Sequence, residues 1–422
     1  MRQLYLVLLT CAVFLFLPSS MRAQFGASKD STAAAHELLT LKATDGRSHE
    51  IEAIALGRSG NTDVVYFVER VSDVVSREVL NPDGEYLLWK LDTTGKLLHK
   101  EFLTKMPNPG PPRVTIVPLA PPLDGAIVIG VFEDRFGWSL LRVDGAGKLV
   151  KSVKLINEPG AFVTALLLPD AKGLLLAGQY GLKGNVWKVD LDGKAIWKKT
   201  YNPIAKPDDK TAKTDDKSSA KLYSITLTDD QGGFIAAGDF GPINKLGLGQ
   251  RSVWLMRCDA AGAVLSETTF PGRLPLICSV GKENFAVLYG VRPGMTIESR
   301  VRIVDSQLKQ QWEKRAEFTS VWVDPPAISP IPSHQAFVLA GCNVIVDKEK
   351  KSAKRECRLF QYDANGEIAS STSIPLTQKA FLRTRVVCEP HRAYVAAQTK
   401  GFGYMEIQEA SIFVISLQKQ RE

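Results

Sequence analysis

The sequence predicts an all-β fold, a seven-bladed β-propeller built from four-stranded antiparallel blades. Three observations lead to this prediction. A short apolar run that ends in Gly recurs along the chain, and a second apolar run that closes on an Asp-x-x-Gly turn follows each copy. The pair returns with a period of roughly 50 residues, which is typical of a repeat architecture. No long stretch of helical periodicity follows residue 23.

The first run of each unit is short, rich in β-branched and aromatic residues, and bounded by turn residues, all of which predict a strand. Its copies are Ala126–Gly130, Leu174–Gly178, Phe234–Gly238, Phe285–Gly290 and Phe337–Gly341. Several copies are apolar at every position, as Leu174-Leu175-Leu176 shows. Continuous apolarity indicates that both faces of the strand are covered, as when one small sheet packs between two others.

The second run of each unit ends at an Asp that starts a tight turn. These residues are Asp92, Asp144, Asp190, Asp259, Asp305 and Asp363. The Asp side chain bonds backbone N–H groups, and the Gly three places on tolerates a left-handed conformation. In the fifth copy the Gly is absent and Leu308 stands there. We therefore expect the third and fourth strands of each blade to flank this turn.

Six turns mark six units, and the seventh unit is incomplete at its C-terminal end. Ser411–Leu417 supplies a third strand, but the chain ends before a fourth. Glu37–Lys42 precedes the first unit and belongs to none, so we expect it to be the missing strand. Such a closure of the ring removes an exposed sheet edge.

The N-terminus is typical of an export signal. Arg2 is the positive end, Leu4–Leu17 is apolar but too short for a comfortable membrane span, and small residues lead to Ala23. We expect residues 1–23 to be a signal peptide, 24–35 a flexible segment, and 36–422 a single propeller domain with a low-complexity insert at 203–221. The sequence predicts an exported protein, periplasmic or extracellular, with no transmembrane span in the mature chain.

The net charge is +8, and it falls to +6 when residues 1–23, with Arg2 and Arg22, are removed. The basic residues are scattered, whereas a nucleic-acid partner requires a concentrated basic face. We expect a monomer with no nucleic-acid partner.

Five cysteines remain after residue 23, and none has CxxC spacing, so the sequence predicts no structural zinc site. Cys342 and Cys357 lie on strands expected to be hairpin partners, and an exported chain could oxidise them to a disulfide. The alternative is that both are buried thiols.

The pattern Asp-x-x-Gly-x-x-x-Trp after an apolar run resembles the blades of bacterial quinoprotein-like propellers. Only Asp190-Gly193-Trp197 carries the whole pattern, whereas the Asp305 and Trp312 copy lacks the Gly. The resemblance covers most of the mature chain and implies a propeller fold and export. The cofactor-binding dehydrogenases of that family also carry adjacent cysteines, and this chain has no Cys-Cys pair. We therefore predict no cofactor.

Motifs for catalysis are missing from the sequence. It contains no HExxH, no GxSxG and no phosphate-binding GxxxxGK[ST]. Its five histidines have no metal-ligand spacing, and we predict no metal site. Two of them, His334 and His391, fall in short first-to-second strand turns of neighbouring blades.

The lengths of the loops give the best functional signal. Connections between strands one and two, and between three and four, open on one face of a propeller and are short here. The others open on the opposite face and are long and irregular, which usually marks the binding face. Exposed aromatic residues and Arg are enriched at binding sites. The candidate ligand or partner residues on that face are Asp134, Arg135, Trp138, Tyr180, Asp239, Arg292, Trp322 and Tyr404.

Each candidate has a structural alternative. Trp138 and Trp322 could begin or cap strands, and Arg135 could pair with Asp134. The sequence favours a binding or scaffold module for a protein, peptide or glycan over an enzyme. The alternative is a hydrolase or lyase with a site at the central channel, and a quinone-dependent dehydrogenase comes third, because propellers host all three functions.

Overall fold

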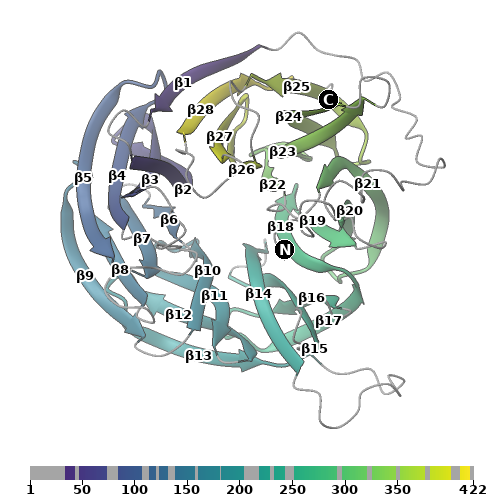
Figure 1. The fold of residues 1–422 in the computed structure, drawn as a ribbon. Helices are drawn as coiled ribbons and strands as arrows, with labels where there is room; N and C mark the ends of the chain where they lie inside the picture. Colours follow the sequence, from purple (N-terminus) through teal and green to yellow (C-terminus); the bar gives the residue numbers. More distant parts are fainter. Residues whose placement is uncertain are drawn as a thin grey trace, which may run out of the picture.

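The structure, a computed structural model, describes residues 34–42, 47–73, 84–106, 114–119, 123–131, 138–156, 160–180, 182–203, 218–228, 232–242, 251–291, 297–320, 326–347, 352–375, 381–400 and 409–418. These residues form seven four-stranded antiparallel sheets, arranged as a ring around a central axis (Figure 1). None of them is helical. The predicted seven-bladed β-propeller is confirmed.

Each blade runs outward from the axis in four strands, and blade 1 is formed by β2 to β5. The innermost strands are β2 (Arg47–Ser59), β6 (Thr115–Pro118), β10 (Gly160–Leu167), β14 (Ser218–Leu227), β18 (Arg273–Val280), β22 (Ala327–Pro330) and β26 (Phe381–Glu389). The second strands are β3 (Thr62–Asp73), β7 (Ala126–Val131), β11 (Gly173–Tyr180), β15 (Phe234–Pro242), β19 (Asn284–Val291), β23 (Ala336–Asp347) and β27 (Arg392–Lys400). The third strands are β4 (Gly84–Asp92), β8 (Trp138–Val143), β12 (Lys183–Asp190), β16 (Ser252–Cys258), β20 (Ile297–Asp305), β24 (Ser352–Asp363) and β28 (Glu409–Ser416). The outermost strands are β5 (Leu97–Met106), β9 (Leu149–Ile156), β13 (Ala195–Tyr201), β17 (Val264–Pro271), β21 (Gln310–Ser320), β25 (Ile368–Ile374) and, in blade 7, β1 (Ala35–Leu41).

The first strand that the structure describes closes the ring. β1 pairs antiparallel with β28, and Thr40 shares a side-chain hydrogen bond of 2.8 Å with Ser411. The expected N-terminal closure is confirmed, with the strand beginning two residues earlier than Glu37. The seventh blade is therefore made from both ends of the chain, and β28 does not lie at a sheet edge.

The six Asp turns have the predicted geometry. In the first, the Asp92 carboxylate accepts hydrogen bonds from the backbone N–H groups of Thr94 and Lys96, at 2.9 and 3.0 Å. Gly95 follows with a φ of 88°, which is a left-handed conformation. The bond from the N–H four residues after the Asp recurs in the next five blades, and the bond from the N–H two residues after it recurs in blades 3 to 6. In blade 5 the non-glycine Leu308 takes this conformation, with a φ of 61°.

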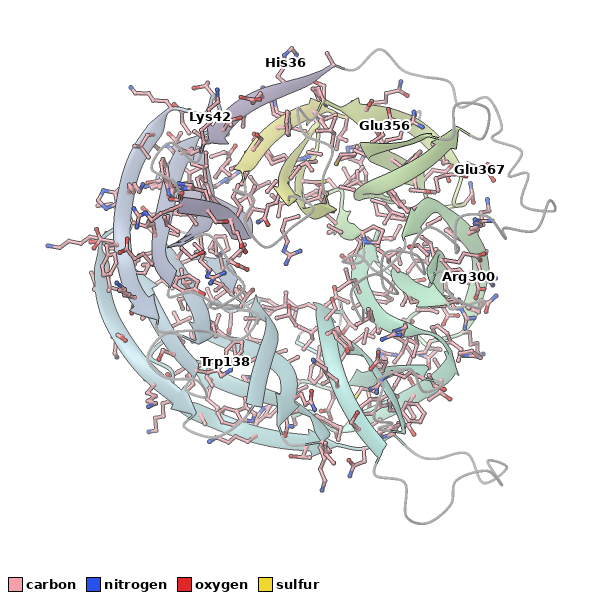
Figure 2. All side chains as sticks on the ribbon, in the orientation of Figure 1. His36, Lys42, Trp138, Arg300, Glu356 and Glu367 are labelled. Carbon is pink, nitrogen blue, oxygen red and sulfur yellow. The ribbon has the colours of Figure 1, made fainter. Side chains whose placement is uncertain are left out.

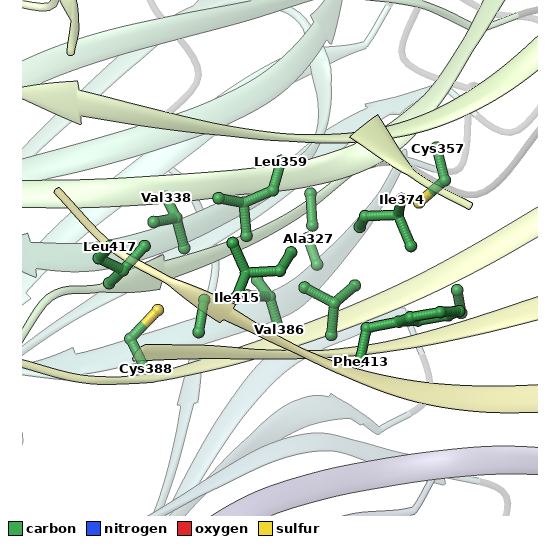
Figure 3. Close-up of a cluster of buried hydrophobic side chains, with 14 of the residues drawn as sticks. Ala327, Val338, Cys357, Leu359, Ile374, Val386, Cys388, Phe413, Ile415 and Leu417 are labelled. Carbon is green, nitrogen blue, oxygen red and sulfur yellow. The ribbon is translucent and has the colours of Figure 1, made fainter. Parts of the chain in front are cut away.

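The core is divided among the junctions between blades. Side chains fill the space between neighbouring sheets (Figure 2), and the buried apolar residues form seven clusters, one at each junction. The cluster between blades 6 and 7 includes Val338 and Leu359 on one side and Val386 and Ile415 on the other (Figure 3). Because each sheet lies between two such clusters, its strands are apolar on both faces.

The run Leu174-Leu175-Leu176 illustrates this arrangement. Leu174 and Leu176 belong to the cluster shared with blade 2, whereas Leu175 belongs to the cluster shared with blade 4. The expectation that both faces of this strand are covered is confirmed.

Two segments depart from the expected strand bounds. The sequence indicates that 347–356 is one of the long connections, but pairing between β23 and β24 continues into it as far as Asp347 and Ser352. β14 begins at Ser218, inside the insert expected at 203–221, of which residues 204–217 lie outside the described residues. Both segments are rich in charged and polar residues, so their sequences lack the apolar run that predicts a strand.

Among the residues that the structure describes, no helix is long and apolar enough to cross a membrane.

Candidate functional site

The two faces of the ring differ in their connections. On what we term the turn face, two to seven residues join strands one and two in all seven blades, and strands three and four in blades 1 to 6. On the opposite, long-loop face the connections range from the single residue 272 to ten residues at 74–83 and sixteen at 202–217. The strand bounds thus reproduce the asymmetry expected from the sequence.

Trp138 is the first residue of β8, on the long-loop face of blade 2. Its side chain is only 2% exposed and packs with Ile129, Leu140 and Trp187 in the cluster between blades 2 and 3. Figure 2 shows it within the wall of the ring. Trp138 thus begins a strand, as the structural alternative states, and its side chain contributes to the core.

Asp239 lies at the long-loop end of β15 and is 1% exposed. Its carboxylate accepts a hydrogen bond of 2.9 Å from Arg251 Nε and another of 2.9 Å from the backbone N–H of Leu274. Arg251 also donates to the hydroxyl and carbonyl oxygens of Ser219, at 3.3 and 3.2 Å. A buried carboxylate needs such partners, and here they join β14, the two ends of the β15–β16 connection, and the start of β18.

Tyr180 ends β11 on the same face, opposite Lys183 in the β11–β12 register. The other predicted residues, Asp134, Arg135, Arg292, Trp322 and Tyr404, lie outside the described residues. A binding role for the whole set stays a prediction.

Cys342 and Cys357 are directly opposite each other in the register of β23 and β24. The expectation that they lie on hairpin partner strands is confirmed. Opposite residues in an antiparallel pair have Cα atoms about 4.5 or 5.5 Å apart, and a disulfide takes Cα separations of about 4.4–6.8 Å. The register is therefore compatible with the predicted disulfide, which stays a prediction.

A pocket of about 360 Å³ opens at the turn-face end of the innermost strands. Its lining comes from strand ends and turns of blades 1, 2, 6 and 7, and the residues are Leu56, Gly57, Arg58, Asp63, Pro118, Leu119, Pro332, Cys388, Glu389 and Pro390. Three prolines and two leucines make its walls mostly apolar and rigid, as in many small-molecule sites. Sequence reasoning missed this pocket because no single repeat contains it.

Polar groups stand at the rim of this pocket. Arg58 Nε and Asp63 Oδ1 form an exposed ion pair of 3.1 Å. The Glu389 carboxylate accepts a hydrogen bond of 3.2 Å from the buried Tyr394 hydroxyl. The rings of His334 and His391, both in turns beside the pocket, lie edge to face with centroids 6.1 Å apart. The structure thus brings together two turn histidines that are 57 residues apart in the sequence.

A charged cluster joins blades 4 and 5 on the outer part of the ring. Glu313 accepts hydrogen bonds from Arg300 Nη1 at 2.9 Å and from Arg302 Nε at 2.8 Å, and the Arg302 guanidinium lies 3.6 Å above the Phe270 ring. Burial raises the pKa of Glu313, but hydrogen bonds from Tyr289, Arg302 and Arg300 outweigh it and hold the pKa below its ordinary value. The carboxylate is ionised, and its partners are side chains of the protein itself, so we assign the cluster a structural role.

Within the described ranges, no group of three or more His, Cys, Asp or Glu side chains is placed to hold a metal ion.

No protein-family model and no curated protein matches the chain. Among solved structures, a protein of unknown function from Dyadobacter fermentans is 11% identical, with 91% of this chain and 100% of that chain covered and a TM-score of 0.48. A protein from Lactobacillus plantarum is 14% identical, with 84% and 95% covered and a TM-score of 0.42. A prolyl endopeptidase is 11% identical with a TM-score of 0.45, but the match covers 84% of this chain and only 48% of the peptidase. None of these similarities carries an argument about function.

Proposed function

We propose that this protein is an exported β-propeller of the quinoprotein-like repeat type, and that its long-loop face binds a protein, peptide or glycan in the cell envelope or outside the cell. The proposal rests on one observation, the difference between the two faces. The strands of seven similar blades are joined by turns of two to seven residues on one face and by connections of one to sixteen residues on the other. Elaborated loops on a rigid scaffold are typical of binding proteins.

The Asp turns on the turn face hold neighbouring blades together. Residues of one blade reach the Asp turn of the next, as when the Tyr201 hydroxyl donates to the Gly262 carbonyl oxygen at 2.8 Å. Lys151 contacts Asp192 at 2.7 Å, and Arg257 donates to the Ser306 carbonyl oxygen at 3.1 Å. Because these bonds use turn atoms, a change of turn length would disturb the junctions, whereas the long-loop face carries no such repeated restraint among the described residues.

The base of one long connection is rigid. The β15–β16 connection runs between Asp239, which is buried, and Arg251, which is partly buried and paired with it. A binding loop that begins and ends on fixed groups presents its side chains with less loss of entropy on binding. This geometry supports the same assignment of the face.

The proposal is tested with the chain from residue 24 onward, which keeps every strand that the structure describes. It is applied to arrays of envelope glycans and of peptides from envelope proteins, and the affinity for each retained compound is then measured by biolayer interferometry. The test variant carries Asp134→Ala and Arg135→Ala. Trp138 is left unchanged because it belongs to the core.

A matched control carries Lys282→Ala and Glu283→Ala, one base and one acid in an exposed turn on the opposite face. We expect a retained compound whose affinity falls about tenfold or more in the Asp134/Arg135 variant and is unchanged in the control. Equal losses in both variants, or no retained compound at all, would count against the proposal.

A further inference from the structure

The outermost strands of blades 1 to 6 each carry a β-bulge at the same place. In every case the residue skipped by the pairing is the sixth after the Asp of the turn. These residues are Leu98, Val150, Ile196, Leu265, Gln311 and Ala369. A bulge bends the strand and redirects a side chain. The fold repeats this feature at the same position in six blades.

In four consecutive blades a branched aliphatic residue occupies the bulge. Leu98, Val150, Ile196 and Leu265 are 45, 54, 56 and 55% exposed, and together we term them the aliphatic arc. Blades 5 and 6 have Gln311 and Ala369 instead. The other large exposed apolar residues of the described chain also fall on blades 1 to 4, and they are Leu97, Phe102, Leu182 and Val264. The strands β5, β9, β13 and β17 follow one another around the circumference (Figure 1).

Positive charge gathers on the same side of the ring. The strands β5, β9 and β13 carry six lysines and one acidic residue, whereas the other four outermost strands carry two basic and four acidic residues. Lys96, Lys148 and Lys194 each stand at the fourth position after the turn Asp, beside the arc. The same position holds Ala263 in blade 4, Lys309 in blade 5 and Glu367 in blade 6. Exposed aliphatic groups and lysines together are complementary to an anionic, partly apolar surface.

The arc lies close to the turn lysines. It begins two residues beyond them, and at 3.3 Å per residue it lies about 7 Å farther from the turn tips along the strand. If the outer edge of the turn face is tilted onto a bilayer, the lysines and the arc both reach its surface, where the lysines meet phosphates and the aliphatic side chains leave water.

We propose that the turn-face rim of blades 1 to 4 binds the surface of a bilayer containing anionic phospholipid. A second copy of this chain would bring lysines against lysines, and a nucleic acid would leave the aliphatic side chains in water. In this orientation the long-loop face points away from the membrane. The inference uses other residues than the function proposed above, and lipid vesicles and soluble ligands test the two separately.

The experiment is sedimentation of the chain from residue 24 onward with vesicles of phosphatidylcholine, either alone or with one third phosphatidylglycerol, at low and high salt. We expect binding only to the anionic vesicles and weaker binding at high salt. Each lysine near such a surface contributes about fivefold to partitioning. Because Lys100 and Lys151 contact Glu69 and Asp192, the charge variant is Lys96→Gln, Lys148→Gln, Lys194→Gln, and we expect it to partition about a hundredfold more weakly.

A second variant, Val150→Ser with Ile196→Ser, removes apolar area and keeps every charge, and we expect about a tenfold loss or more. The matched control makes the same kinds of change in blade 5, Lys309→Gln with Gln311→Ser, and we expect no loss. The changed residues are exposed, and an unaltered unfolding midpoint verifies the fold of each variant. No binding to anionic vesicles, equal binding to neutral ones, or losses matched by the control would overturn the proposal. So would a dimer, seen by light scattering, that the Val150/Ile196 variant dissociates, because the arc would then be a self-interface.

Discussion

Trp312 of blade 5 lies against Gly366 in the Asp turn of blade 6, and its indole N–H donates a hydrogen bond of 2.9 Å to the carbonyl oxygen of Ala364. Trp197 of blade 3 lies in the same way against Gly262 of blade 4. Both tryptophans are the seventh residue after their turn Asp. The Asp-x-x-Gly-x-x-x-Trp pattern therefore has a physical meaning, since the Trp of one repeat docks on the Gly of the next.

The first prediction concerns this docking. A Cβ added at Gly366 would lie 2.5 Å from the Trp312 ring, and the residue has a φ of 73°. Gly366→Ala therefore combines backbone strain with overpacking, and we expect it to lower the free energy of unfolding by about 3 kcal/mol. The matched variant is Gly60→Ala, where φ is 58° and no atom lies within 4 Å of the new Cβ. We expect about 1 kcal/mol there. Urea unfolding of both checks the difference, and equal losses would show that the Trp312 contact is unimportant.

The second prediction concerns Leu308, which takes the left-handed conformation that glycine takes in the other five Asp turns. Glycine at this position would relieve about 1 kcal/mol of strain. However, Leu308 is 5% exposed in the cluster between blades 4 and 5, and its loss would remove about 2–3 kcal/mol of burial and leave a cavity. We expect Leu308→Gly to destabilise the protein by about 2 kcal/mol in the same assay. A gain in stability would mean that strain outweighs packing here.

The third prediction separates a buried ion pair from an exposed one. Asp239 is almost completely buried against Arg251, so Asp239→Ala leaves a charge without its partner and should lower the free energy of unfolding by about 3–5 kcal/mol. Asp63 pairs with Arg58 at the surface, where both side chains are more than half exposed. We expect less than about 1 kcal/mol for Asp63→Ala. Thermal unfolding measures both variants, and similar losses would contradict the structural role of Asp239.

The fourth prediction is a loss of stability at alkaline pH. Burial raises the pKa of Cys258 and of Cys388 to about 12, and that of Tyr66 to about 12 as well. Folding therefore favours the neutral form of each group. This contribution is fully present below the unfolded pKa values, 9.0 for the thiols and 10.0 for the phenol, and is lost as the pH rises toward 12. We expect the urea midpoint to fall steadily above about pH 9. For Cys258→Ala, the urea midpoint should fall less between neutral and alkaline pH than it does for the unsubstituted protein.

The fifth prediction is the disulfide between Cys342 and Cys357. In protein purified from an oxidising compartment without reductant, we expect iodoacetamide in denaturant to label three of the five cysteines that follow residue 23. Prior reduction should raise the number to five. Labelling of all five without reductant would exclude the bond, and mass spectrometry distinguishes the two results.

The parts of the fold that could be predicted are those encoded within one repeat. The Asp turns depend on a side chain and two backbone N–H groups a few residues away, so Asp92 and its five counterparts could be recognised from sequence alone. The closure by the first strand followed from counting strands. The double-sided apolar runs, such as Leu174–Leu176, indicated the stacking of blades.

The parts that could not be predicted depend on contacts between repeats. Trp138 and Asp239 lie beside long connections, where a sequence suggests exposure. Blade 3 covers the Trp138 side chain, and Arg251 pairs with the Asp239 carboxylate. The pocket near Glu389 is assembled from four blades, so no local sequence pattern indicates it. The bulge residues need the strand register, because only the pairing shows which residue of β9 or β13 is skipped.

The pairing of β1 with β28 also sets an order in time. Thr40 and Ser411, which share a hydrogen bond across this pair, are 371 residues apart, so β1 cannot pair until β28 has been made. Blades 1 to 6 are each formed from consecutive segments, but the seventh cannot form until residues 409–416 are present. Until then β1 lacks its partner strand, and the ring stays open.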